Sequence, residues 1–419
     1  MHRILYNIFL FLYKIGIRTA SLWDQKAKLW LEGRKDFFEK LQKTMIPGER
    51  FIWVHCSSVG EFEQVSPLLD NIRKVYPSYK IFLTFFSSSG FEAQKNSRHV
   101  DYVFYLPLDS AKNANRLIGI INPLLVIFVK YEFWYYYLKG IKKRNIPLLL
   151  VSAIFRKDQP FFKWHGLLYR RMLSFFTHIF VQNEASKKLL KKNNMVAGVS
   201  VSGDTRFDRV IEIAEKFVPV DSIAQFAGSD KIIVAGSTWS EDEKIINRYL
   251  KNNSAPGSKW IIAPHEINTK HLEDLRELFP GSIFYSQINA GSDLLNSNVL
   301  IIDNIGMLSR LYKYATIAYI GGGFGKNGIH NVLEAAVYGK PIIFGPVYHQ
   351  FNEAKELLLN HGAITISSYE EFEISIKKIL NEESTRIRIS EKARTYVYSN
   401  KGATEKIMRY IQENRLLTN

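Results

Sequence analysis

Two glutamates in this chain follow apolar runs, at positions where a carboxylate can act on a bound molecule. Glu61 stands in HCSSVGEFE, His55–Glu63, directly after the apolar run 51–54. The small residues before it, Ser58 and Gly60 among them, let the backbone approach a ligand closely. The plainer role is that of a carboxylate in a first helical turn, which stabilises the helix dipole by about 0.3–1 kcal/mol. The run of small residues favours the stronger role, and we expect Glu61 to act as a general base.

A second carboxylate has a similar setting. The segment VKYEFW, Val129–Trp134, places Glu132 after another apolar run, with Trp134 nearby. We expect Glu132 to orient an acceptor or to steady Glu61.

A glycine-rich stretch has the features of a phosphate-binding turn. IAYIGGGFGKNGIHNVLE, Ile317–Glu334, ends an apolar run in three glycines. Exposed amides at a turn or a helix start bind phosphate, and we expect a helix to begin near His330 or Asn331. The spacing matches neither a Walker A loop nor the dinucleotide fingerprint, and an ordinary flexible loop is the alternative. Glu334 follows Asn331 by three residues, where it can bind a ribose diol or remain a solvated charge.

Two further apolar runs end in polar residues, in AGSTWSEDE (Ala235–Glu243) and APHEI (Ala263–Ile267). Thr238 or Ser240 is expected to cap the following helix or to contact a ligand, and the two roles can coexist. His265 is expected to be exposed at a strand end, where it serves either a ligand or the fold.

The elements that must position these residues form two series of apolar runs separated by longer mixed segments. The first series is FIWVH, KIFLTFF, LLVIFV, PLLLVSA and HIFVQN, and the second is KIIVAGST, KWIIAPHE, SIFYS, VLIID, TIAYIGGG and PIIFGP. This pattern predicts parallel strands covered by helices on both faces. The segment 207–229 interrupts it. We therefore expect two doubly wound α/β domains, 46–217 and 218–419, the second with terminal helices, and ligands at the strand ends in a cleft between them.

Composition limits the function classes. The chain has 419 residues, 46% apolar and 23% charged, which is enough to bury sizeable cores. Cys56 is the single cysteine, so an internal disulfide and a cysteine zinc site are excluded and a reducing compartment is favoured. There is no HExxH motif, and we expect neither a metal nor another cofactor.

The net charge of +16 predicts an anionic partner, namely a membrane surface, a phosphorylated substrate or nucleic acid. A coding bias toward lysine is the alternative. The lysines and arginines are scattered and no recognition motif is present, which argues against nucleic acid.

The segment 1–45 begins MHRILYNIFLFLYKIGIRTASLW, with ten residues between Arg3 and Lys14. A spanning helix needs about 20 apolar residues, so this run is too short to cross a membrane. No small-residue cleavage site of a signal peptide follows it. On a helix, Arg3, Asn7, Lys14 and Arg18 form a polar stripe beside an apolar face, which predicts a helix lying in a membrane interface. An amphipathic helix packed on its own domain is the alternative.

Taken in order, seven motifs resemble those of 3-deoxy-D-manno-octulosonic acid (Kdo) transferases over nearly the whole chain. They are HCSSVGE, YEFW, GDTRFD, AGST, APHE, DNIGML and GGGF with GIHNVLEAA. The resemblance implies a GT-B fold and an inverting glycosyltransferase of lipopolysaccharide synthesis. Such an enzyme moves Kdo from CMP-Kdo to the 6′-hydroxyl of a lipid A precursor, lipid IVA. The resemblance also implies a Gram-negative protein on the cytoplasmic face of the inner membrane, peripheral or anchored by its N-terminal helix.

By this resemblance Glu61 is the general base and Glu132 is a second glutamate of the first domain. The remaining substrate- and nucleotide-binding positions are Ser58, Gly60, Ser237, Thr238, Pro264, His265, Ile305, Gly306, Met307, Gly322, Gly323, Phe324, Asn331 and Glu334.

The chain departs from the family pattern at a few positions. Most members have Pro-Arg-His where Pro264-His265-Glu266 stands, and many have Glu in place of Lys130. Lys326 can supply the missing cation. A UDP-sugar glycosyltransferase, a sugar-nucleotide 2-epimerase and a non-catalytic membrane-binding protein are the alternatives.

Overall fold

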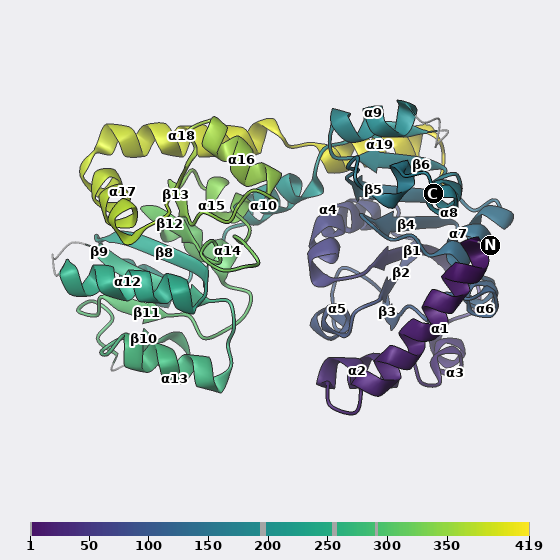
Figure 1. The fold of residues 1–419 in the computed structure, drawn as a ribbon, viewed down its shortest axis with the longest axis horizontal. Coiled ribbons are helices and arrows are strands. Elements are labelled where there is room, and N and C mark those ends of the chain that lie inside the picture. The colour runs from purple at the N-terminus through teal and green to yellow at the C-terminus, as the bar shows by residue number, and fades with distance from the viewer. Residues whose placement is uncertain (1, 193–197, 254–257, 290–291, 419) are drawn as a thin grey trace. The chain divides into compact units, whose positions relative to one another are not determined.

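The computed structural model describes residues 2–192, 198–253, 258–289 and 292–418. The chain forms two compact units (Figure 1). Unit 1 is Met1–Arg209 with Gly402–Asn419, and unit 2 is Val210–Lys401. Each unit contains a seven-stranded parallel sheet flanked by helices. The predicted α/β class, with two doubly wound units of GT-B type, is confirmed.

The sheet of unit 1 has the strand order β3-β2-β1-β4-β5-β6-β7. Alternate residues face opposite sides, so Trp53 and Phe128 lie in one core while Val54 and Ile127 lie in the other. Both faces are apolar because both are covered by helices. The strands are β1 (Arg50–Cys56), β2 (Tyr79–Phe85), β3 (Tyr102–Tyr105), β4 (Leu125–Val129), β5 (Leu148–Ala153), β6 (His178–Val181) and β7 (Val199–Val201). The helices are α4 (Val59–Val75), α5 (Ser88–Gln94), α6 (Ala111–Ile121), α7 (Tyr135–Lys143), α8 (Leu167–Leu173) and α9 (Glu184–Lys192).

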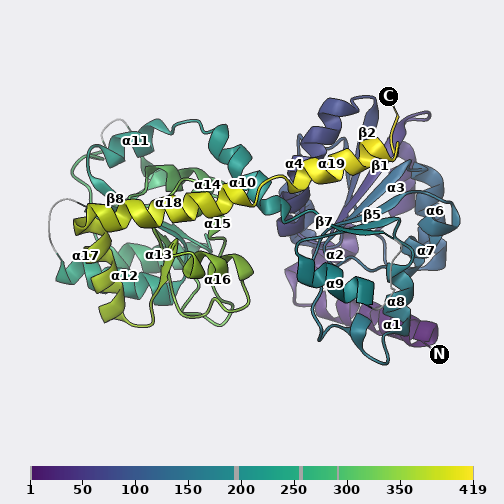
Figure 2. The same ribbon diagram turned by 90° about the horizontal axis from the view of Figure 1, so that it is seen from above.

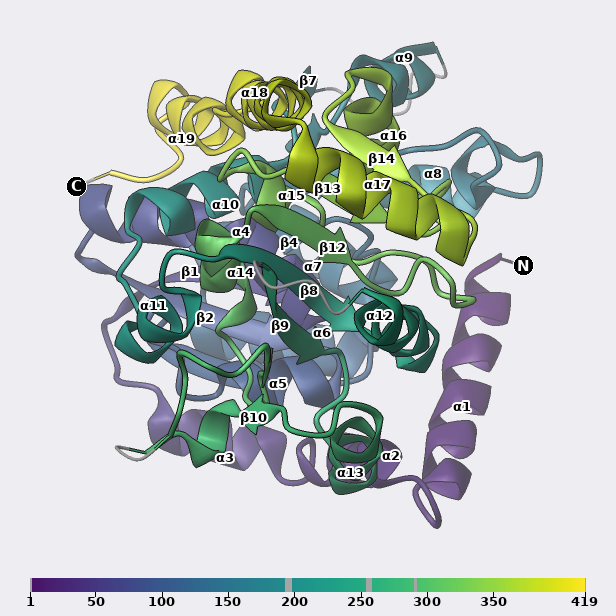
Figure 3. The same cartoon turned by 90° about the vertical axis from the view of Figure 1, so that its left-hand side faces the viewer.

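Unit 2 has the order β10-β11-β9-β8-β12-β13-β14. Phe372 packs edge-on against Tyr249 and Tyr319, so that α12 and α17 lie against one face of the sheet (Figure 3). The strands are β8 (Lys231–Thr238), β9 (Ser258–Pro264), β10 (Ile283–Phe284), β11 (Val299–Ile301), β12 (Ile317–Ile320), β13 (Ile342–Phe344) and β14 (Ala363–Thr365). The helices are α11 (Asp221–Ala227), α12 (Ser240–Asn252), α13 (Thr269–Leu278), α14 (Leu308–Leu311), α15 (Leu333–Ala336), α16 (Asn352–Leu359), α17 (Tyr369–Asn381) and α18 (Glu383–Ser399). Helix α10 (Thr205–Glu215) leads into unit 2.

Three helices precede the first sheet: α1 (His2–Ala20), α2 (Gln25–Glu32) and α3 (Phe37–Thr44). Helix α1 packs on unit 1 through Tyr6 and Leu10, and the Tyr6 hydroxyl donates to Asp109 Oδ2 at 2.7 Å. Its opposite face leaves seven large apolar side chains exposed: Ile4, Leu5, Ile8, Phe9, Phe11, Leu12 and Ile15. The helix thus packs on its own unit with one face and leaves its apolar face exposed. Among the described residues, no helix is long and apolar enough to cross a membrane.

The last helix, α19 (Ala403–Glu413), returns to unit 1 beside α4 (Figure 2). Ile407 and Ile411 lie in the same core as the apolar face of α4. Asp208 accepts hydrogen bonds from the backbone N–H groups of Gly402 and Thr404, both at 2.6 Å. The predicted domain 218–419 therefore differs from unit 2 at its C-terminal end, because Gly402–Asn419 belongs to unit 1. An amphipathic pattern shows that a helix face is buried but does not show against which sheet.

Replacing Ile411 by alanine should destabilise unit 1 by about 2–5 kcal/mol, because a fully buried side chain leaves a cavity. Hydrogen–deuterium exchange should become faster in α4 and α19 and stay unchanged in α17. Ile374→Ala, which shortens an exposed side chain of α17, is the matched control. Faster exchange in α17 of the Ile411→Ala protein would contradict the position of α19.

Candidate active site

Both candidate glutamates of unit 1 lie where its strand order reverses. Strands β1 and β4 are neighbours in the sheet, and the chain leaves them toward opposite edges. Glu61 follows β1 and Glu132 follows β4. In open α/β sheets the carboxyl ends of the strands at such a switch point form the usual ligand site. The structure therefore brings the two residues to the same edge of one sheet.

Glu61 lies in the first turn of α4 and is only 9% exposed. Its carboxylate accepts a hydrogen bond from the backbone N–H of Ser57, while Ser58, at the N-cap position, makes no side-chain capping bond. A Cβ added at Gly60 would meet nothing within 4 Å. The fold itself therefore does not require glycine there, and there is open space beside the helix start.

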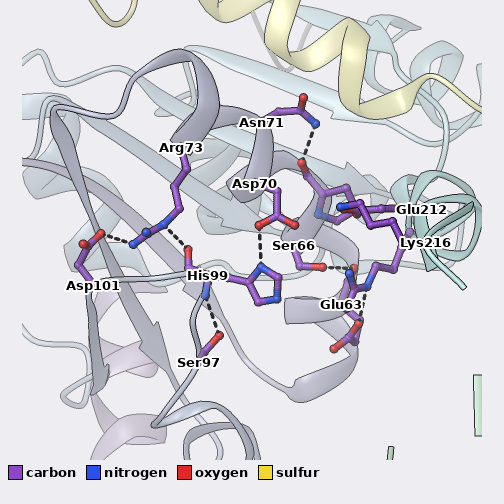
Figure 4. A network of polar contacts seen from close by, with 12 residues as sticks. Glu63, Ser66, Asp70, Asn71, Arg73, Ser97, His99, Asp101, Glu212 and Lys216 are labelled. Carbon is purple, nitrogen blue, oxygen red and sulfur yellow. Dashed lines mark hydrogen bonds and ion pairs between the residues drawn. The ribbon is translucent and has the colours of Figure 1, made fainter. Parts of the chain in front are cut away.

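The helix that carries Glu61 is fixed along its length by polar contacts (Figure 4). Asp70 Oδ1 lies 2.6 Å from His99 Nδ1, and Arg73 donates to Asp101 Oδ2 at 2.7 Å. Arg73 also donates to the carbonyl oxygen of His99 at 2.9 Å. These contacts tie the C-terminal half of α4 to the segment that enters β3.

Glu132 is buried and held by two aromatic rings. One of its oxygens, Oε2, lies 2.8 Å from His55 Nε2 and accepts from Trp134 Nε1 at 2.6 Å. The other ring nitrogen of His55 lies 2.9 Å from Thr84 Oγ1, and Trp53 Nε1 donates to the same hydroxyl at 2.9 Å. Glu132 therefore has a fixed position, whereas Glu61 has a backbone amide as its described partner.

Burial is the largest cause of a raised pKa at Glu61. Desolvation and then the negative charge of Glu132 raise the pKa to about 7, although the Ser57 amide, His55 and Lys130 pull it down. Burial likewise raises the pKa of the neighbouring Cys56 thiol well above its ordinary value. At neutral pH, Glu61 is therefore a much better proton acceptor than an ordinary glutamate.

The corresponding edge of unit 2 lies between β8 and β12. Ser237 and Thr238 end β8, and Gly321, Gly322 and Gly323 follow β12. The glycines are required by their own packing: a Cβ at Gly321 would lie 2.3 Å from the Ser237 oxygen, and Gly322 has φ +87°. Internal packing thus explains these glycines without a ligand.

Asp242, in the first turn of α12, was not predicted as a site residue. It accepts hydrogen bonds from the Tyr319 hydroxyl at 2.6 Å, from Gly322 N at 2.8 Å and from Trp239 N at 2.9 Å. The Gly322 amide, a candidate for binding phosphate, is therefore already engaged by a carboxylate of the chain. The acidic first turn of the helix, SEDE, was the available signal for this contact.

Three aromatic rings stack at the ends of β8, β9 and the loop after β12. The His265 ring lies 4.2 Å from that of His330 and 4.8 Å from that of Trp239, and Trp239 Nε1 donates to His330 Nε2 at 3.1 Å. Burial, and secondarily His265, lowers the pKa of His330 to about 4. His265 itself is exposed. Sequence reasoning found His265 but missed the two rings that support it.

The other residues of unit 2 that were predicted to bind the nucleotide differ in exposure and in their contacts. Asn331 Nδ2 donates to Glu334 Oε1 at 3.0 Å, and α15 begins at Leu333 instead of near His330 or Asn331. Lys326 is exposed, and Phe324 packs on the core of unit 2. The others are Ile305, 92% exposed; Gly306, with φ +95°; and the buried residues Met307, Gly323 and Pro264.

The raised pKa of Glu61 predicts a pH-dependent stability. The ordinary value is 4.5 and the folded value is about 7, so the contribution to stability is full below the ordinary pKa and is lost as pH rises through about 7. Glu61→Gln should therefore be more stable than the wild type at pH 8, by about 1–3 kcal/mol, with a smaller difference at acidic pH. Urea unfolding at both pH values measures this, with Glu63→Gln on the same helix as control. A difference that does not depend on pH would contradict the raised pKa.

Comparison with protein families gives a match to 3-deoxy-D-manno-octulosonic-acid transferase (kdotransferase) over residues 30–209. A bifunctional glycosyltransferase/methyltransferase of Fusobacterium nucleatum is 27% identical and is matched over 100% of this chain, which spans 62% of that relative's length. The 3-deoxy-D-manno-octulosonic acid transferase of Aquifex aeolicus is 27% identical over 86% of this chain and 94% of its own length. That of Haemophilus influenzae is 25% identical over 86% of both.

Among solved structures, the UDP-GlcNAc 2-epimerase of Neisseria meningitidis bound to UDP-GlcNAc has a TM-score of 0.62 at 15% identity, covering 87% of this chain and 100% of its own. At that identity the likeness concerns the fold alone. The sequence matches are more specific. Residues 30–209 match the kdotransferase family, and the chain is similar over most of its length to Kdo transferases.

Proposed function

We propose that this protein transfers Kdo from CMP-Kdo to the 6′-hydroxyl of a lipid A precursor, lipid IVA, with Glu61 as general base. The observation that carries the proposal is the buried Glu61 at the switch point of unit 1, with a pKa raised to about 7. The similarity to Kdo transferases supports the donor and the acceptor.

In the proposed step, the Glu61 carboxylate takes the proton from the acceptor hydroxyl. The hydroxyl oxygen then attacks the anomeric carbon of Kdo, and the bond between that carbon and the phosphate oxygen breaks. CMP leaves with the electron pair, and the anomeric configuration inverts. A base whose pKa is near the working pH is the most effective for such a transfer. Burial keeps the pKa of Glu61 high, and the charge of Glu132, which His55 and Trp134 hold in place, adds to this effect.

The donor is proposed to bind unit 2 at the carboxyl ends of β8, β9 and β12. The exposed His265, supported by its ring stack, and the exposed Lys326 are the candidate contacts for the anionic phosphate and carboxylate. Asn331 and Glu334 are proposed to bind the ribose, and the segment 305–307 to lie near the base. Groups that neutralise the leaving phosphate lower the barrier most when they are already in place.

The acceptor lies in a membrane, and we propose that the exposed apolar face of α1 rests in the interface of the inner membrane on its cytoplasmic side. Phe9, Phe11 and Leu12 are each more than half exposed on that face. The cationic residues of α1 and the net charge of +16 suit an anionic lipid surface.

Transfer can be tested directly by mass spectrometry after incubation of the protein with CMP-Kdo and lipid IVA in detergent. The wild type should add the mass of Kdo, and Glu61→Gln should lose roughly 10²–10⁴-fold in rate because the proton acceptor is removed. CMP should still protect Glu61→Gln in a thermal melt. Full activity of this variant would remove Glu61 from the role of base, and protection by UDP in place of CMP would favour a UDP-sugar enzyme.

Binding of α1 to a membrane can be tested with two matched double variants. Ile8→Ser/Ile15→Ser removes two half-exposed isoleucines of α1, and Ile374→Ser/Ile387→Ser removes two exposed isoleucines of unit 2. The first should weaken co-flotation with anionic vesicles about tenfold or more, since each lost apolar side chain costs about 1 kcal/mol of burial. Equal binding of both variants would contradict the docking of α1.

A further inference from the structure

A pocket of about 650 Å³ lies in unit 1 among α1, α2, α3 and α6, on residues that the proposed reaction does not use. In Figure 1 these helices lie together along one side of unit 1. The pocket is lined by aromatic rings and by four cationic side chains, Lys14, Arg18, Arg34 and Arg116.

The charge of this pocket is not balanced by its own acids. Two carboxylates, Asp36 and Glu39, also line it, and Glu39 already pairs with Lys43 at 2.7 Å. Within the described ranges, Lys14, Arg18 and Arg116 form no ion pair with a carboxylate. The pocket therefore attracts anions.

Arg34 is a partly buried cation that lies over the ring of Trp30, 3.7 Å from its centroid. It donates to the carbonyl oxygens of Phe86 at 2.7 Å, Leu106 at 2.8 Å and Trp30 at 2.9 Å, and no carboxylate of the described chain pairs with it. A cation removed from water without a counter-charge favours a nearby anion.

Trp30 forms part of the aromatic wall of the pocket. It is 7% exposed and lines the pocket, and its Nε1–H has no hydrogen-bond partner among the described residues. The Nε1 atom is itself buried, so a ligand in the pocket would be held by the cationic side chains, which prefer anionic acceptors. Phosphate oxygens are such acceptors, and guanidinium groups bind them with charge-assisted hydrogen bonds.

The pocket is continuous with the exposed apolar face of α1. Lys14 follows Phe11 by three residues, and Arg18 follows Ile15 by three, so each cation is adjacent on the helix to an exposed apolar side chain. We propose that this pocket binds the phosphate of a membrane amphiphile, whose acyl chains lie against the apolar face of α1. The proposal rests on the docking of α1 proposed above and is independent of the sugar donor.

A charge-matched pair of variants tests the pocket on the full-length protein. Arg18→Gln/Arg116→Gln removes two exposed cations of the pocket from α1 and α6. Arg3→Gln/Lys112→Gln removes two exposed cations from the same helices, outside the pocket. Flotation is measured on phosphatidylcholine vesicles containing phosphatidic acid, and on vesicles of equal surface charge containing oleate. A second pair, Lys14→Gln against Arg3→Gln, repeats the test with single changes.

On phosphatidic acid, the pocket variant should bind at least about tenfold more weakly than the control variant, because it loses contacts to phosphate as well as general attraction. On oleate, the two variants should bind equally. Equal losses on phosphatidic acid would overturn the pocket, leaving general attraction to the surface. Displacement of the wild type from vesicles by inorganic phosphate would overturn the amphiphile and indicate a free-anion site.

The same measurements separate this inference from the proposed reaction. Pocket-dependent binding to phosphatidic acid together with failure of Kdo transfer would uphold the pocket and reject the reaction. Failure of the wild type to bind phosphatidic acid vesicles, with transfer intact in detergent, would reject the pocket and the docking of α1 but not the reaction.

Discussion

Burial of Glu61 beside the charge of Glu132, at the carboxyl ends of two adjacent strands, is the constraint on which unit 1 depends. Water is largely excluded from both carboxylates, and burial, followed by the charge of Glu132, raises the pKa of Glu61. Glu132 is held by His55 and Trp134, whereas Glu61 has the Ser57 amide as its described partner. The raised pKa gives Glu61 the proton affinity that a general base needs at neutral pH.

The rest of unit 1 maintains this pair. Strands β1 and β4 are buried along nearly their whole lengths, which fixes the distance between the two strand ends. The contacts of Asp70 and Arg73 secure α4 from outside, and α19 packs against its apolar face. Unit 2 repeats the same plan with different chemistry. Its strand ends carry a ring stack and a glycine loop whose Gly322 amide is engaged by Asp242.

Much of this could be predicted from the sequence, because local patterns carry it. Apolar runs separated by mixed segments predicted the two sheets, and their ends predicted where Glu61, Glu132 and His265 lie. The short strands β3, β7 and β14 were missed.

What could not be predicted depends on contacts between distant segments. The return of α19 to unit 1 is set by its partner sheet, and the link from Asp242 to Gly322 spans 80 residues. The support of His265 by Trp239 and His330 has the same origin. Arg34 meets Phe86 and Leu106 only after folding, so no local motif indicates its pocket. Residue types thus predicted which groups can do chemistry, and tertiary contacts decided which of them are engaged by the fold itself.

We propose that burial, together with the charge of Glu132, holds Glu61 as a base near neutral pH. The most direct measurement is the pH dependence of single-turnover Kdo transfer in the wild type and in Glu132→Gln. We expect a rate that rises with pH through about 7 in the wild type, and the same rise at lower pH in the variant, because a like charge has been removed. A rise at the same pH in both proteins, or a wild-type rate that does not rise through this range, would contradict it.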